Sequence, residues 1–130
     1  MNKINDLLIA ESEKYISALL AEKLPENFIF HNFNHALLVK KYAETIGEHS
    51  DLTADEMNIL RISALFHNVG YVNSYEQYHE ESVIIASAFL AEHKVYQQTI
   101  DHISEIIRAT KLPQSPKDRI AEVLCDADMM

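Results

Sequence analysis

The strongest constraint in the sequence is the nearly continuous apolar run over residues 62–70, ISALFHNVG, which ends on an imidazole, an amide and a glycine. A helix that is apolar all round is buried on every side, so this segment predicts the central helix of a core. Buried polar side chains are costly unless they are hydrogen-bonded or bound to a ligand. His67 and Asn68 therefore need polar partners, and the chain has six other histidines.

The rest of the chain also favours helices. It has only two glycines and three prolines, and Leu, Ile, Ala, Glu and Lys are abundant, which are residues that suit helices. At 130 residues the chain is long enough for one domain with its own core. We expect an all-α fold, with residues 1–130 forming a single bundle of about five to six helices.

The spacing of apolar residues places the expected helices. They cover residues 3–23, 31 or 34 to 48, 53 to about 68, 78–93, 96–110, and 117 or 118 onward. Thr53 and Glu56 form a capping box at the start of the third helix, and Gly70 is expected to stop it. Residues 27–30 are expected to be an apolar connector, and residues 71–77 a polar and aromatic loop.

The last helix contains two acids that differ in direction. Asp128 shares a helix face with the apolar residues of that segment, whereas Asp126 shares one with Arg119 and Glu122. Asp128 is therefore the carboxylate expected to point inward, where it needs a cation or a hydrogen-bond donor.

The formal charge of −9, from 20 acidic and 11 basic residues, opposes binding to extended nucleic acid or to an anionic membrane surface. A small phosphorylated ligand is compatible with this negative charge, because a metal ion can invert the field inside one pocket.

Cys125 is the single cysteine, which fits a reducing compartment. The longest uncharged apolar stretch, residues 83–91, is too short for a membrane helix, and no signal peptide is expected. These features predict a cytoplasmic protein.

Imidazoles, an amide and a carboxylate stand at helix ends or on an inward face: His31, His35, His67, Asn68, His79 and Asp128. Neutral imidazoles with a carboxylate suit a divalent transition metal, and such a site can hydrolyse a substrate with a metal-activated water. Arg108 and Lys111 could meet a substrate phosphate, or only complement the dipole of their helix C-terminus. Tyr71 and Tyr75 could stack on a base, or only pack the loop.

Four segments carry a resemblance: HNFNH at 31–35, LFHNVGY at 65–71, HEES at 79–82 and DAD at 126–128. In this order, and over residues 28–130, they resemble the motifs of the HD-domain metal-dependent phosphohydrolase superfamily. The resemblance implies an HD-type helical bundle that holds a divalent ion, with Mn, Fe, Zn, Mg and Ni all as candidates.

The resemblance also implies residue roles. His35, His67 and Asp128 match the metal ligands, and Asn68 stands where the family's His-Asp pair has its Asp. His31 matches the proton donor to the leaving group in related cyclic-nucleotide phosphodiesterases. His79, together with Lys111 and Arg108, is a candidate for a second metal or for substrate, although Thr110 stands where a further histidine would support a second metal.

Two departures from the family pattern limit the expected activity. Asn68 can coordinate through its carbonyl but brings no charge, so metal affinity and water activation should both fall; the sequence leaves open whether it is natural or engineered. The chain also stops two residues after Asp128, which is compatible with truncation or with completion by a neighbouring chain.

The expected function is therefore a phosphohydrolase or phosphodiesterase that acts on a nucleotide or other small phosphate ester and is weakened by Asn68. The alternative is a non-catalytic HD-fold module that binds a nucleotide or regulates a partner, and a third is a helical interaction module. The sequence leaves homo-oligomer formation open.

Overall fold

The described backbone, in a computed structural model of residues 1–130, forms six α-helices and one short 3₁₀ helix. Side chains are described for residues 1–25 and 32–130. The helices are α1 (Asp6–Lys23), α2 (Glu26–Glu48), α3 (Ala54–Phe66), η1 (Val69–Val72), α4 (Tyr78–Glu92), α5 (Gln97–Ala109) and α6 (Arg119–Asp128). Within this backbone the only bridge of β type is an isolated pair, Asn2 with Val95. The expected all-α fold is confirmed.

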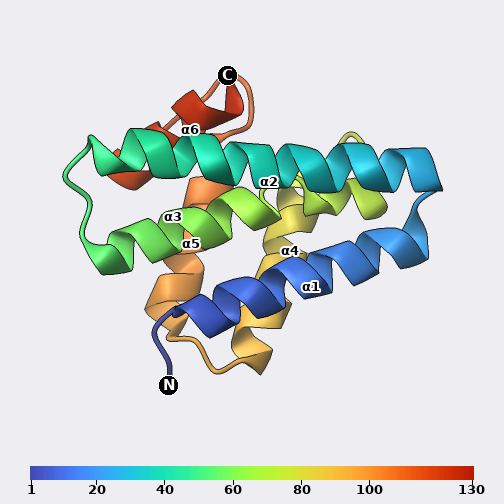
Figure 1. Cartoon of the computed structure of the whole chain (residues 1–130), viewed down its shortest axis with the longest axis horizontal. Helices are drawn as coiled ribbons and strands as arrows, with labels where there is room; N and C mark the ends of the chain where they lie inside the picture. The colour runs from blue at the N-terminus through green and yellow to red at the C-terminus, as the bar shows by residue number, and fades with distance from the viewer.

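Helix α3 lies at the centre of the bundle and packs against every other helix. Figure 1 shows α2 running along the length of the molecule, with α1 and α3 beside it, α4 and α5 crossing behind them, and α6 next to α2. Leu60, Ile62, Leu65 and Phe66 of α3 have no exposed surface. The apolar run therefore forms the central helix, as its composition predicts.

The start of α3 is the predicted capping box. The Thr53 hydroxyl accepts a hydrogen bond from the Glu56 amide at 3.1 Å, and the Glu56 carboxylate accepts one from the Thr53 amide at 2.9 Å. Two of the amides that a helix leaves without partners are thereby satisfied.

The start of α2 was not predicted correctly. Residues 27–30, expected to be a connector, belong to the first turns of α2, which begins at Glu26 directly after Pro25. Proline favours helix starts because its fixed φ fits the turn and because the first amides of a helix need no partner inside it. The proline that ends α1 therefore also begins α2.

Gly70 has a different role from the predicted helix stop. Helix α3 already ends at Phe66, and Gly70 lies inside η1 without the left-handed backbone of a glycine cap. A Cβ atom at Gly70 would lie 2.1 Å from the Tyr78 carbonyl oxygen and 2.5 Å from the Ser82 amide nitrogen. The Gly70 amide donates to the Ser82 hydroxyl at 2.8 Å. Close packing of η1 against α4, not a turn, requires glycine here.

Gly70→Ala should therefore destabilise the protein by about 3 kcal/mol or more, because the clash is with backbone atoms that cannot move aside cheaply. Urea unfolding followed by circular dichroism measures this change. Gly47→Ala is the matched control, since its Cβ would meet side-chain atoms alone, the flexible end of Met57 at 2.8 Å and Leu60 Cδ2 at 3.2 Å. Equal losses of stability in the two variants would contradict the packing argument.

Helix α6 is fixed at its start by Asp118. The Asp118 carboxylate accepts a hydrogen bond from the Ala121 amide at 2.8 Å, as an N-cap, and lies 2.6 Å from Nε2 of His102 on α5. Burial alone would raise the pKa of Asp118, but these partners lower it. At the other end of α6 Asp128 points inward and Asp126 is exposed, as predicted.

None of the described helices is both long and apolar enough to cross a membrane.

Candidate metal centre

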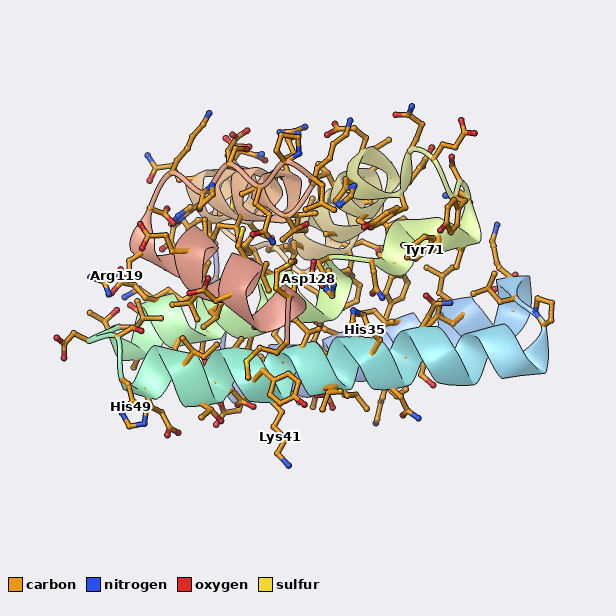
Figure 2. All side chains as sticks on the ribbon, turned by 90° about the horizontal axis from the view of Figure 1, so that it is seen from above. His35, Lys41, His49, Tyr71, Arg119 and Asp128 are labelled. Atoms are coloured by element: carbon orange, nitrogen blue, oxygen red, sulfur yellow. The ribbon has the colours of Figure 1, made fainter. Side chains whose placement is uncertain are left out.

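Three elements bring His35, His67 and Asp128 together. His35 lies on α2, His67 directly follows α3, and Asp128 is the last residue of α6. One candidate ligand atom from each residue lies within 4.8 Å of the other two. Figure 2 shows Asp128 and His35 facing the space between α6 and α2. The three residues are separated by up to 93 positions in sequence but share one site in the fold.

The orientation of His67 is fixed by its own helix. Its Nδ1 lies 2.6 Å from the Ala64 carbonyl oxygen, which can only accept, so Nδ1 carries the proton and donates. In the neutral ring the lone pair is then on Nε2. Donation of the second ring N–H to a carbonyl is how metal-binding histidines are commonly oriented.

The atom that faces this lone pair is itself an acceptor. His67 Nε2 lies 3.1 Å from Asp128 Oδ1, and His35 Nε2 lies 3.5 Å from the same oxygen. A neutral imidazole nitrogen and a carboxylate oxygen repel at this distance unless a proton or a metal cation lies between them. The donor set therefore fits a cation on chemical grounds.

The separations of the two imidazole nitrogens from Asp128 Oδ1 also fit one metal ion. Bonds of 2.0–2.2 Å with angles between octahedral and tetrahedral place neighbouring ligand atoms about 3.0 to 3.5 Å apart, close to the 3.1 and 3.5 Å observed. Burial alone would raise the pKa of Asp128, but the neighbouring imidazoles of His35 and His67 lower it well below its usual range. The carboxylate is held ionised, which is the form a metal binds.

Asn68 lies next to this group. It is only 5% exposed and lines the same cavity as the three candidate ligands. No hydrogen bond of its side chain is found among the described side chains. The amide is thus positioned to meet a ligand of the cavity, but the donor set of His35, His67 and Asp128 contains a single negative charge.

The cavity above the site has a volume of about 800 Å³. One end is polar and holds the candidate ligands, while the remaining wall is mainly aromatic and aliphatic. The lining residues are Leu24, Pro25, Asn32, Asn34, His35, Leu38, His67, Asn68, Tyr71, Tyr75, Tyr78 and Asp128. A volume of this size suits a small organic ligand.

His79 is buried near this site without lining the cavity. It is 8% exposed, and its Nε2 has no hydrogen-bond partner among the described residues. Burial lowers its pKa, and the nearby His67 lowers it further. A neutral imidazole with an unused nitrogen is compatible with the predicted role in a second metal or in substrate binding, which stays a prediction.

The other predicted residues are not gathered at the cavity. Arg108 forms ion pairs with Glu80 and Glu105, both at 3.0 Å, on the outer surface of α4 and α5. Lys111 is exposed, and neither cation lines the cavity. The side chain of His31 lies outside the described residues, so its role as proton donor also stays a prediction.

Tyr78 lines the cavity but was not among the predicted site residues; it was only the first residue of an expected helix. The signal that could have found it is its nearness in sequence to Tyr71 and Tyr75, both already candidates for stacking on a base.

Comparison with known proteins agrees with this geometry. The sequence model of the HD domain matches residues 32–130, which include His35, His67 and Asp128. No curated protein and no solved structure that was compared matches the chain. HD domains typically hold divalent metal ions, and a group that could hold one is present here. Because the match covers most of the sequence, the chain belongs to the HD-domain family.

Proposed function

We propose that the chain is a phosphohydrolase or phosphodiesterase that uses one divalent metal ion and acts on a nucleotide or another small phosphate ester. The observation that carries this proposal is the convergence of His35, His67 and Asp128 at the polar end of a ligand-sized cavity. Family membership supports the same class of activity.

The described residues have distinct roles in this proposal. When bound, a divalent ion would supply an acidified water and a Lewis acid for a phosphoryl oxygen. His35, His67 and Asp128 would hold it, with His67 kept in register by the Ala64 carbonyl. The Asn68 amide would donate a hydrogen bond to a phosphoryl oxygen, and His31 would protonate the leaving oxygen.

Asn68 changes the charge balance of the site. With a second carboxylate a divalent ion would be neutralised, whereas Asp128 alone leaves a net charge of +1 on the loaded centre. The ion is then held less tightly, but an anion is attracted more strongly. This balance favours one alternative in particular, a module that binds a nucleotide without turning it over.

Isothermal titration calorimetry with Mn²⁺ and Zn²⁺ tests the metal site. The protein should bind one equivalent of ion, and His35→Ala should weaken the affinity by on the order of tenfold or more. His35 has a side chain that is 45% exposed, so its removal should leave the fold intact. His49→Ala is the control, because His49 is exposed and outside the cavity. Absence of metal binding would reject the proposal.

Release of nitrophenolate from bis(4-nitrophenyl) phosphate and 4-nitrophenyl phosphate then separates the two functions. Turnover that depends on added Mn²⁺ and is lost in His35→Ala supports the enzyme. Saturable binding of inorganic phosphate to the metal-loaded protein without turnover of either ester supports the non-catalytic module.

A further inference from the structure

The cavity is amphiphilic. His35, His67, Asn68 and Asp128 form its polar end, and the other described lining residues are mostly apolar or aromatic, with Asn32 and Asn34 as the polar exceptions. A ligand that fills the volume must therefore place a polar group at the metal centre and a less polar group between the walls. This inference rests on the proposed function, because it takes the polar group to be a phosphoryl group.

One wall consists of Tyr71, Tyr75 and Tyr78, which we call the tyrosine wall. Tyr71 and Tyr78 are stacked, with ring centroids 4.1 Å apart and an angle of 18° between the rings. Tyr75 is tilted by 41° to Tyr71, at 5.4 Å. Figure 2 shows Tyr71 on η1, on the same side of α2 as His35 and Asp128.

Tyr75 is the unusual member of this wall. It is 79% exposed although it lines the cavity, so one aromatic surface is offered to a ligand instead of to the core. Leu38, from α2, also lines the cavity and is 44% exposed. Leu24 and Pro25 contribute further apolar surface. A flat ring could be covered on both faces in such a site.

The phenols of Tyr71 and Tyr78 should remain neutral. Burial raises the pKa of Tyr71 and, more strongly, that of Tyr78, whose pKa is raised further by its hydrogen bond with Tyr71. Neutral phenols do not repel an anionic ligand.

Positive charge is missing from the cavity. No Lys or Arg occurs among its described lining residues, and the sequence of residues 26–31 contains neither. Arg108 is occupied by Glu80 and Glu105 on the outer surface. Beyond the metal centre there is thus no cation to neutralise a second or third phosphate group, and the net charge of the chain is −9.

We infer that the substrate is a monophosphate with a flat aromatic group, of the nucleoside monophosphate class, and that Tyr75 is the residue that selects for the ring by stacking on it. Stacking discriminates little between bases, because every base has a π-face. The subsite should therefore accept purines and pyrimidines, and it should reject sugar phosphates without a base.

Calorimetric titrations in the presence of saturating Mn²⁺ test this inference. Adenosine 5′-monophosphate and uridine 5′-monophosphate should each bind about tenfold or more tighter than ribose 5-phosphate, which is typical of stacking on one aromatic residue. Adenosine 5′-triphosphate, at equal free Mn²⁺, should bind no tighter than the monophosphate.

Three variants identify the residue responsible. Tyr75→Ala should abolish most of the preference for the nucleotide over ribose 5-phosphate, and Tyr75→Phe should retain it because the ring is kept. Tyr96→Ala is the matched control, since Tyr96 is also an exposed tyrosine but lies outside this cavity. Tyr75 is so exposed that its replacement should not disturb folding.

The outcomes separate this inference from the proposed function. The ring subsite would be overturned, and the metal site would stand, if ribose 5-phosphate bound as tightly as the nucleotides. This binding would depend on the metal and would be equal in the unaltered chain and in Tyr75→Ala. The proposed function would be overturned, and the ring subsite would stand, if the protein bound neither Mn²⁺ nor ribose 5-phosphate but bound adenosine without metal. Tyr75→Ala would then lose the binding of adenosine. Tighter binding of the triphosphate would overturn the restriction to one phosphate group.

Discussion

Replacing Asn68 by Asp is expected to raise the affinity for Mn²⁺ by at least about tenfold, because the number of charged ligands strongly tunes the affinity for a divalent ion. Asn68 lies beside His67, is buried, and lines the cavity with the three candidate ligands. A carboxylate there would add a second negative charge to the donor set. Metal-dependent hydrolysis of phosphate esters should increase in parallel.

The same substitution should destabilise the metal-free protein. A new buried carboxylate close to Asp128 would have no cation to pair with, and an uncompensated buried charge costs about 3 kcal/mol. Loading with Mn²⁺ removes this penalty and stabilises the folded state by mass action. The melting temperature of Asn68→Asp should therefore lie below that of the unaltered chain without metal, and the difference should shrink or reverse with it.

Differential scanning calorimetry with and without Mn²⁺ measures this crossover. Asn5→Asp is the matched control, because Asn5 caps α1 by accepting a hydrogen bond from the Leu8 amide, a role that Asp fills equally well. That variant should show no metal-dependent change relative to the unaltered chain. A stability of Asn68→Asp that is independent of Mn²⁺ would place residue 68 outside the metal centre.

Local sequence patterns predicted the features that depend on one helix at a time. The capping box of Thr53 and Glu56 has a pattern that spans four residues, and it is present as predicted. The inward direction of Asp128 and the outward direction of Asp126 follow from the helical period alone. The burial of the second half of α3, residues 62–66, follows from the lack of any polar residue there except Ser63.

Features that depend on contacts between distant segments were beyond these patterns. Gly70 was predicted to stop a helix, because its sequence position shows nothing of the α4 backbone that lies against it. Arg108 was assigned to substrate or to the helix dipole, but its partner Glu80 is 28 residues away. The resemblance supplied the grouping of His35, His67 and Asp128, whereas their separations came only from the fold.

Asp128→Asn is expected to have the largest effect on the metal centre. It removes the only carboxylate of the candidate donor set. Both His35 Nε2 and His67 Nε2 lie closest to one oxygen of this carboxylate, Oδ1. Replacement of residues that merely support a metal ligand already costs 10- to 100-fold in affinity, so loss of this carboxylate should lower the affinity for Mn²⁺ by about 100-fold or more.

The unaltered chain provides a second readout, since its melting temperature should rise with Mn²⁺ concentration as binding to the folded state stabilises it. Asp128→Asn should lose this dependence. Asp126→Asn is a closely matched control, because the same change two residues earlier in α6 removes an exposed carboxylate with the same formal charge. If both variants kept the dependence on Mn²⁺, the ion would bind elsewhere. If both lost it, long-range charge rather than coordination by Asp128 would account for the affinity.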